Sequence, residues 1–230
     1  MTKRSDFKPK KSLGQNFLVN NKIYRFMAEE IAPEKGEIVL EVGPGEGILT
    51  DYLSESGAQI IAVEKDRQLV PILKEKFKNR KNVHPVSGLA RDKVASPEDL
   101  GEATTNGVKI IEGDILKFDP KKYKLKEGQY KIVGNIPYYI TSHLLRIILE
   151  EWPKPKLILF MVQKEVAQRI TAKPPEMSLL ALAVQFYAET KIIKNVSRNN
   201  FRPVPQVDSA LIKIIPKTDL PYSKDFRKNI

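Results

Sequence analysis

The chain has 230 residues, 41% of them hydrophobic, which is enough apolar material for one large domain with its own core. Lysine and arginine number 39 against 28 acidic residues, and the net charge of +11 favours a polyanionic partner such as RNA or DNA. Cysteine is absent and histidine occurs twice, which excludes disulfides, thiolate nucleophiles, iron–sulfur clusters and thiolate zinc sites.

The order of elements along the chain is that of an α/β protein. Residues 1–11 are rich in lysine and predict a flexible basic arm, with no apolar stretch behind it that would make a secretory signal. The apolar runs are far shorter than the ~20 residues that cross a bilayer, so we expect a cytoplasmic protein without a membrane segment. Helix spacing of apolar residues predicts a first helix over 22–31. Further strands are expected at 37–42, 59–64, 108–112, 130–135, 156–162, 190–197 and 207–215, and further helices at 46–56, 66–79, 139–151, 164–171 and 178–188.

Strands that alternate with helices predict a mostly parallel sheet with helices on both faces. The nearly continuous apolar runs in the first two strands are typical of parallel strands buried on both sides. Residues 82–107 interrupt the alternation with turn formers and predict a long loop or insertion. We therefore expect one domain over residues 12–217, followed by a short stub at 218–230.

A glycine-rich turn separates the first of these strands from its helix. The stretch Glu41–Gly47 contains three glycines, which let the backbone turn sharply and approach a ligand closely. Its G-x-G-x-G spacing differs from the dinucleotide motif G-x-G-x-x-G, and the sequence has no P-loop motif. Glu64 ends the next strand, where its carboxylate could accept hydrogen bonds from both ribose hydroxyls of an adenosine-containing ligand. Alternatively, this is a tight turn and Glu64 is an unrelated surface residue.

Asp114 follows the third strand of the alternating pattern, at the edge where an open sheet presents its ligand crevice. Its carboxylate could accept a hydrogen bond from an exocyclic amine such as adenine N6. Taken alone, Asp114 is equally well explained as a helix cap or a turn residue.

The tetrapeptide Asn135–Tyr138 reads Asn-Ile-Pro-Tyr and lies at the carboxyl end of the fourth strand. Adenine N6 is a poor nucleophile because its lone pair is delocalised into the ring, so a site that alkylates it needs acceptors for both N6 hydrogens. The side-chain oxygen of Asn135 and the carbonyl of Ile136 could supply them, with Pro137 holding that carbonyl in place. Tyr138 offers a face for base stacking, worth about 1–3 kcal/mol. Alternatively, the stretch is a turn and Tyr138 belongs to the core.

Four motifs occur in a fixed order: Ser12–Leu18, Glu41–Gly47, Asn135–Tyr138 and Phe201–Ala210. Together they resemble the ribosomal RNA adenine N6-dimethyltransferase family, the KsgA type of dimethyladenosine transferase. The resemblance implies a class I S-adenosylmethionine-dependent methyltransferase (Rossmann-like) sheet of seven strands with an antiparallel final hairpin. It implies S-adenosylmethionine as methyl donor, without a metal. The implied substrate is small-subunit (16S) rRNA, in which two adjacent adenosines near the 3′ end are dimethylated.

The resemblance also implies which residues would bind the donor. Asn16 and Leu18 would close the donor pocket from the N-terminal side. The turn that contains Gly43 and Gly45 would lie against the methionine portion, and Glu64 would bind the ribose.

The remaining implied roles concern the two adenine rings. Asp114 would read the adenine of the donor, and Asn135 would sit where the donor and acceptor sites meet. Tyr138 and Phe201 would sandwich the target adenine. An alternative for Phe201 is an apolar plug beside Pro203.

The chain departs from the family pattern in three places. The segment around 84–107 looks longer than the family needs. Glu176 and Met177 stand where relatives usually carry Tyr-Gly. The family usually adds a small helical C-terminal domain, which we expect to be missing from a chain that ends at Ile230.

The partner expected from charge and resemblance is the small ribosomal subunit precursor, bound by a monomer. The basic arm and the lysine-rich segment Lys117–Lys131 are expected to face the RNA backbone, where phosphate contacts position the substrate. Neither His84 nor His143 is expected to act as a base.

Three alternatives stay open. A methylase of the macrolide-resistance type uses the same chemistry on large-subunit rRNA. A DNA adenine or protein glutamine methyltransferase shares Asn-x-Pro-Tyr but is not expected to carry the Ser12–Leu18 motif. A non-catalytic RNA-binding or ribosome-assembly factor could retain the fold.

Overall fold

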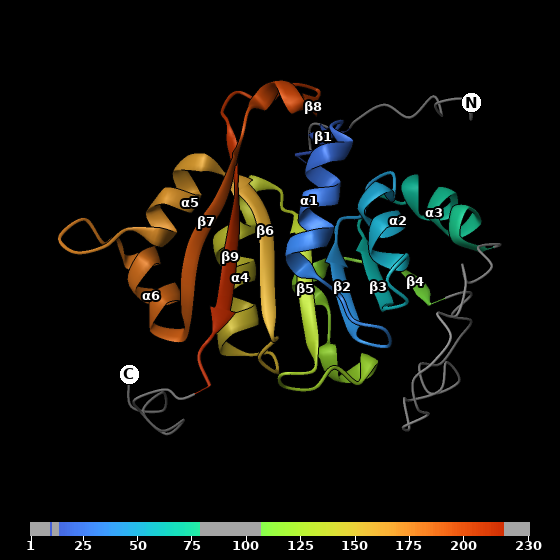
Figure 1. Cartoon of the computed structure of the whole chain (residues 1–230), viewed down its shortest axis with the longest axis horizontal. Coiled ribbons are helices and arrows are strands. Elements are labelled where there is room, and N and C mark those ends of the chain that lie inside the picture. Colours follow the sequence, from blue (N-terminus) through green and yellow to red (C-terminus); the bar gives the residue numbers. More distant parts are fainter. Residues whose placement is uncertain (1–9, 11–13, 79–106, 219–230) are drawn as a thin grey trace.

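The computed structural model describes residue 10 and residues 14–78 and 107–218. These residues form three layers, with a mixed sheet in the middle and helices on both of its faces (Figure 1). The arm at 1–11, the insertion at 82–107 and the stub at 218–230 lie outside the described residues, apart from Lys10, Gly107 and Thr218.

The sheet contains seven strands, each close to its expected position. They are β2 (Ile38–Val42), β3 (Gln59–Glu64), β4 (Val108–Glu112), β5 (Tyr130–Asn135), β6 (Leu157–Gln163), β7 (Ala188–Val196) and β9 (Ser209–Pro216). Their order across the sheet is β4–β3–β2–β5–β6–β9–β7, with β2 to β6 parallel to one another. β9 runs antiparallel to both of its neighbours, so the expected antiparallel final hairpin is confirmed.

In the described residues, six α-helices cover the sheet, three on each face (Figure 1). One face carries α1 (Asn21–Ile31), α2 (Ile48–Ser54) and α3 (Leu69–Lys78); the other carries α4 (Thr141–Glu150), α5 (Lys164–Thr171) and α6 (Leu179–Tyr187). No helix in this part of the chain is long and apolar enough to cross a bilayer.

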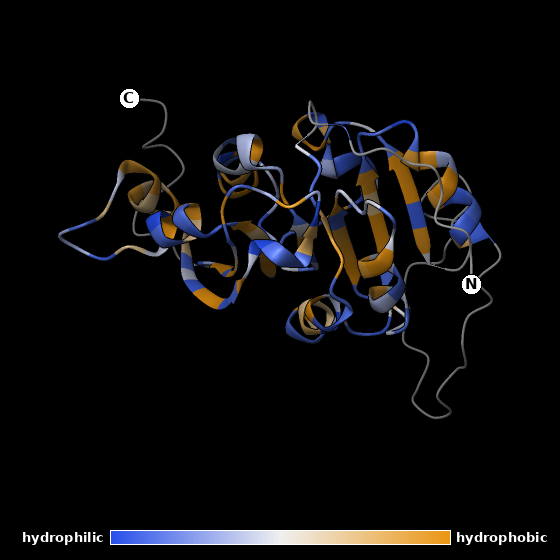
Figure 2. Cartoon of the chain, turned by 90° about the horizontal axis from the view of Figure 1, so that it is seen from above, coloured by the Kyte–Doolittle hydropathy of each residue, from blue (hydrophilic) through white to orange (hydrophobic). Residues whose placement is uncertain are grey.

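The core consists of two apolar clusters, because side chains of a strand alternate between the faces of the sheet. In β2, Val39 packs with α1 to α3, whereas Leu40 and Val42 pack with α4 and the other face. Figure 2 shows the central strands as mostly hydrophobic, as expected for strands that are covered on both sides.

Helix α1 forms because its apolar residues return every fourth position. Ile23, Met27 and Ile31 are all buried against the sheet. The side chain of Asn20 accepts a hydrogen bond from the backbone of Lys22 and caps the helix start. Since α1 precedes the parallel strand β2 and packs back on it, its first turn lies at the carboxyl edge of the sheet (Figure 1).

A second, two-stranded sheet was not expected from the sequence. β1 (Phe17–Leu18) pairs antiparallel with β8 (Phe201–Arg202), near the upper end of Figure 1. This pairing attaches the N-terminal segment to the connection between β7 and β9. It therefore fixes a segment that has no other strand partner in the described residues.

Candidate functional site

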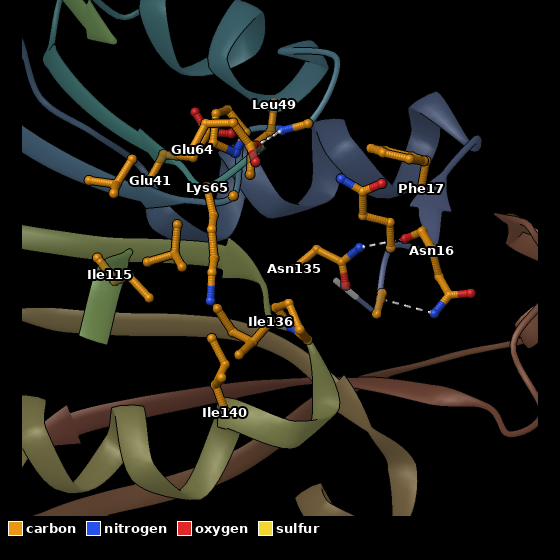
Figure 3. A pocket seen from close by; sticks show the side chains of 18 of the residues that line it. Asn16, Phe17, Glu41, Leu49, Glu64, Lys65, Ile115, Asn135, Ile136 and Ile140 are labelled. Carbon is orange, nitrogen blue, oxygen red and sulfur yellow. Dashed lines mark hydrogen bonds between the residues drawn. The ribbon is translucent and has the colours of Figure 1, made fainter. Parts of the chain in front are cut away.

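A cavity opens at the carboxyl ends of the parallel strands, the edge at which an open sheet offers its side chains to a ligand. It holds about 1090 Å³ of empty space, including its open mouth. Figure 3 shows side chains from several strands and from the N-terminal segment around it. Every predicted site residue except Phe201 lines this cavity, namely Asn16, Leu18, Gly43, Gly45, Glu64, Asp114, Asn135, Ile136, Pro137 and Tyr138.

The glycine turn after β2 presents bare backbone to the cavity. Gly43 and Gly45 have φ values of 66° and 59°, in the left-handed region that side chains rarely adopt. A Cβ atom on Gly43 would meet nothing within 4 Å, whereas one on Gly45 would lie 3.1 Å from the ring of Phe17. Gly43 therefore faces open space that a ligand can fill, and Gly45 lets the N-terminal segment pack against the turn.

Glu64 ends β3, and its buried carboxylate connects the turn to the next loop. One oxygen accepts a hydrogen bond from the backbone of Gly45 at 3.1 Å, and the other from the backbone of Asp66 at 2.8 Å. Burial raises the pKa of Glu64, although the two backbone N–H groups oppose the shift. Each oxygen keeps a second lone pair, so the carboxylate can also accept bonds from ligand hydroxyls.

Asp114 follows β4 and has two protein partners. One oxygen accepts a hydrogen bond from the backbone of Leu116 and caps a short 3₁₀ helix, η3 (Ile115–Lys117). The other lies 2.8 Å from Nζ of Lys65, whose side chain extends along the cavity (Figure 3). Burial raises the pKa of Asp114, but the hydrogen bonds and the Lys65 charge outweigh it, so the pKa lies below the ordinary value. Asp114 is therefore an ionised cap that can also face a ligand.

Asn135 ends β5 and points toward the N-terminal segment. Its Nδ2 donates a hydrogen bond to the backbone carbonyl of Asn16 at 3.0 Å, drawn as a dashed line in Figure 3. Since an amide carries its acceptor beside its donor, this bond sets the side-chain orientation and leaves Oδ1 as the acceptor that a ligand can use. Gly134, just before it, has no room for a side chain, because a Cβ would lie 2.6 Å from the carbonyl of Val42.

The N-terminal segment is held over the cavity by a second anchor, Asp66. This buried carboxylate accepts hydrogen bonds from Nζ of Lys10 at 2.6 Å and from Nε2 of Gln15 at 2.8 Å. Burial raises the pKa of Asp66, but these partners and the backbone of Gln68 lower it below the ordinary value. Gln15 and its neighbours are thereby fixed as one wall of the cavity.

The rest of the tetrapeptide turns from β5 into a short 3₁₀ helix, η5 (Tyr138–Ile140), before α4. Ile136 is buried, and its backbone donates to Met161 of β6 at 3.0 Å. Tyr138 is half-buried and lines the cavity together with the exposed Tyr139. Both tyrosines therefore form part of the cavity wall.

Tyr138 and Phe201, which are expected to sandwich an adenine, lie in different surroundings, and the sandwich stays a prediction. Phe201 is 1% exposed, packs in the core under α1, and does not line the cavity. Its pairing with Leu18 in the small sheet turns the ring inward. The alternative interpretation, an apolar plug, describes this ring.

The lysine-rich segment Lys117–Lys131, which is expected to face RNA, lies mostly away from the cavity. It leads into the start of β5, so most of it lies at the amino edge of the sheet, opposite the cavity (Figure 1). Lys131 is itself buried in β5, 2.8 Å from the carboxylate of Glu37. His143 is exposed on α4 and does not line the cavity; His84 lies outside the described residues.

Sequence reasoning missed several residues of the site. Lys65 and Asp66 directly follow Glu64, and a charged pair next to a proposed binding acid was a usable signal. Glu41 was read only as the start of the glycine turn, although it lines the cavity, is buried and bonds to the hydroxyl of Thr50 at 2.7 Å. Burial raises the pKa of Glu41 to about 8.

The chemistry of the lining suits an adenosyl ligand. The cavity offers an open glycine backbone and carboxylates at the ends of neighbouring strands, which are acceptors for hydroxyl and amino groups. The described residues contain no group of three or more His, Cys, Asp or Glu that could hold a metal ion.

Comparison with known proteins identifies relatives of the whole domain. A model of the ribosomal RNA adenine dimethylase family matches residues 6–88 and 97–228. A protein of Dehalococcoides mccartyi, named ribosomal RNA small subunit methyltransferase A, is 38% identical over 214 residues. That alignment covers 93% of this chain but only 65% of the relative, so the chain spans about two thirds of the relative's length.

Two solved structures of RNA-modifying and adenosine-modifying methyltransferases are also similar to this chain. The 23S rRNA methyltransferase ErmE has a TM-score of 0.71 and 27% identity, over 91% of this chain and 73% of that one. A dimethyladenosine transferase from Plasmodium falciparum has a TM-score of 0.68 and 26% identity, over 87% of this chain and 63% of that one. The predicted class I methyltransferase fold is thereby confirmed.

Proposed function

Because the chain belongs to the ribosomal RNA adenine dimethylase family, we propose that it transfers methyl groups from S-adenosylmethionine to adenine N6 of RNA. The proposed substrate is small-subunit rRNA, in which two adjacent adenosines near the 3′ end receive two methyl groups each. The name of the relative from Dehalococcoides mccartyi supports the choice of subunit.

The observation that carries this proposal is the fixed amide of Asn135. An N6 amino group has two hydrogens and becomes a better nucleophile when both are drawn to acceptors. The bond from Nδ2 to the carbonyl of Asn16 orients the amide, so that Oδ1 can accept one hydrogen. The main-chain carbonyl of Ile136 would accept the other, and Tyr138 would stack on the base.

Residues on the other side of the cavity would hold the donor. Glu64 would accept from the ribose hydroxyls, Asp114 from the amino group of the donor's adenine, and the backbone at Gly43 would lie along the methionine portion. Asn16 and Leu18 would close the site. When bound, S-adenosylmethionine supplies a methyl group that is already activated on a sulfonium, so the protein mainly orients the partners and excludes water.

The test is Asn135→Ala, assayed with labelled methyl donor on small ribosomal subunits that lack the modification. We expect kcat/KM to fall by at least about 100-fold, since an acceptor for the reacting group is lost. Calorimetry should show that S-adenosylhomocysteine still binds. Gln129→Ala removes an exposed side-chain amide just before β5, at the opposite edge of the sheet; it is the matched control and should keep full activity. Undiminished transfer by Asn135→Ala would refute the assigned role.

A second candidate substrate is large-subunit rRNA, because the ErmE structure resembles this chain over most of its length. Offering unmodified large subunits in the same assay separates the two, and mapping of the labelled product identifies the bases. A chain that fails to bind S-adenosylhomocysteine would instead be a non-catalytic RNA-binding factor.

We propose further that the protein acts as a monomer in the cytoplasm. Residues of a single chain line the cavity described above, which supports the monomer. Sedimentation of the protein alone at the assay concentration tests the monomer.

A further inference from the structure

A groove lies beside the cavity, on the face of the sheet that carries α1. Its walls are the first turns of α1, the last residues of β7 and the 3₁₀ turn η6 (Arg198–Asn200). We call it the basic groove and define it by six of its lining residues: Asn20, Lys22, Arg25, Tyr52, Lys194 and Asn200.

Topology puts the basic groove at the same edge as the cavity. The first turn of α1 lies at the carboxyl edge of the sheet, as described above. β7 runs parallel to β6, because both are antiparallel to β9, so β7 also ends at the carboxyl edge. Figure 1 shows the start of α1 together with β1 and β8 at this edge.

The chain passes directly from the cavity into the groove. Leu18 lines the cavity, pairs with Phe201, and is followed by Val19, whose backbone donates to Asn200 at 2.8 Å. Asn20 and Asn200 both line the groove. Only a few residues separate the two sites along the chain. Because one residue spans at most ~3.6 Å, the two sites are also close in space.

The groove carries positive charge that the described protein does not neutralise. Lys22, Arg25 and Lys194 are exposed, and no carboxylate of the described residues forms an ion pair with them. Among the described lining residues, Glu29 is the one acid. Side-chain amides and Tyr52 make up much of the remaining wall, and such groups commonly bond to phosphate and sugar oxygens.

Contacts inside the protein hold this surface in shape. Nδ2 of Asn20 donates to Oδ1 of Asn200 at 2.8 Å, which joins α1 to η6. Nζ of Lys194 lies 4.5 Å from the ring centroid of Phe26, a cation–π distance that joins β7 to α1. The cations are thus presented by fixed elements.

We propose that the basic groove binds the phosphate backbone of the RNA strand next to the adenosine that enters the cavity. This inference rests on the proposed function. A base that reaches an enclosed site must leave its stack, while its own sugar and phosphates stay at the mouth. Flanking phosphates therefore run along the carboxyl edge, where the groove holds three cations. The lysines before β5 lie at the opposite edge and cannot follow the same strand.

The experiment compares two triple variants that remove the same charge. The groove triple removes the three cations of the basic groove and is Lys22→Ala/Arg25→Ala/Lys194→Ala. The control triple removes three exposed lysines at the opposite edge and is Lys121→Ala/Lys122→Ala/Lys126→Ala. Fluorescence anisotropy measures binding of a labelled RNA hairpin with two adjacent adenosines in its loop. Thermal melts and calorimetry with S-adenosylhomocysteine check the fold and the donor site of both variants.

Loss of three phosphate contacts should make the negative slope of log K against log salt shallower by about 2. At about 0.1 M salt, this corresponds to a Kd that is about 100-fold higher. The control triple should stay within about threefold of the wild type. Glu29→Gln removes the acid of the groove and should tighten binding by a few-fold.

The outcomes separate this inference from the proposed function. Loss of RNA binding in the groove triple alone supports the groove, even if no RNA accepts a methyl group. Equal weakening in both triples, or an unchanged salt slope in the groove triple, overturns it, even if methyl transfer is found.

Discussion

Two titratable residues of the cavity, Glu41 and Lys65, acquire their properties from neighbours that the sequence does not reveal. Glu41 lies in β2 under the glycine turn, fully buried, with the hydroxyl of Thr50 as its partner. Its carboxyl group is therefore mostly neutral at pH 7, in contrast to Asp114 on the other side of the cavity.

Glu41→Gln should make the protein more stable at pH 8. Burial raises the folded-state pKa of Glu41 from 4.5 to about 8, so the wild type loses stability as pH rises from about 4.5 to 8, while the unfolded chain ionises freely. Glutamine stays neutral and keeps an acceptor for Thr50. We expect a gain of at least about 1 kcal/mol at pH 8, or roughly 2–4 °C in Tm, and little gain at pH 4.5. Melting curves at several pH values between 4.5 and 8 measure this. A difference in Tm between the two proteins that does not change with pH would contradict the prediction.

Lys65→Met should strengthen donor binding. In the structure the Lys65 ammonium holds the Asp114 oxygen that a ligand amine would use. The pair is partly exposed and worth about 0.5–1 kcal/mol, which corresponds to about twofold to fivefold in Kd. Calorimetry with S-adenosylhomocysteine at two salt concentrations measures this. Weaker binding by the methionine variant would mean that Lys65 contacts the ligand itself.

At the scale of elements, the N-terminal segment completes the site without belonging to the main sheet. Pairing of β1 with β8, the bond from Asn135 to Asn16, and the Asp66 anchor hold it at three separate points. Such a short strand has little stability of its own, so its position depends on these contacts.

Asp66→Asn should loosen this wall. The neutral amide loses the ion pair with Lys10 and presents a donor to Gln15, so residues 14–18 should exchange amide hydrogens faster. We expect the Kd for S-adenosylhomocysteine to rise several-fold, up to about tenfold. Asp119→Asn, which changes the same charge at the cap of the 3₁₀ helix η4 (Pro120–Tyr123) at the opposite edge, is the control. Equal exchange in the two variants would show that Asp66 does not anchor the segment.

At the scale of the whole molecule, the positive charge is divided between the two edges of the sheet. The carboxyl edge combines the cavity with Lys22, Arg25 and Lys194, and the amino edge carries Lys121 to Lys126. Net charge alone does not distinguish these surfaces, because it sums over both. The direction of each strand decides which of these lysines and arginines share an edge with the cavity.

The same distinction explains which predictions from sequence hold. Buried parallel strands such as β3 and β4 can be recognised in the sequence as apolar runs. Their predicted bounds, 59–64 and 108–112, are those of the structure. Motif residues at strand ends meet because parallel strands end at one edge, so the cavity residues were found. Phe201 could not be placed, because its environment depends on a two-residue pairing with a segment far away in sequence. Lys131 was misread as a surface cation, since its partner Glu37 is near only in the folded chain.

The pairing of Leu18 with Phe201 sets the order in which the site can form during synthesis. The first wall of the cavity is translated near the start, but the strand that secures it emerges after almost all of the others. Until then only the Asn135 and Asp66 contacts hold that wall, so we expect a nascent chain to retain a nucleoside less well. Maturation of the pocket is thus a late event of folding, coupled to completion of the final hairpin.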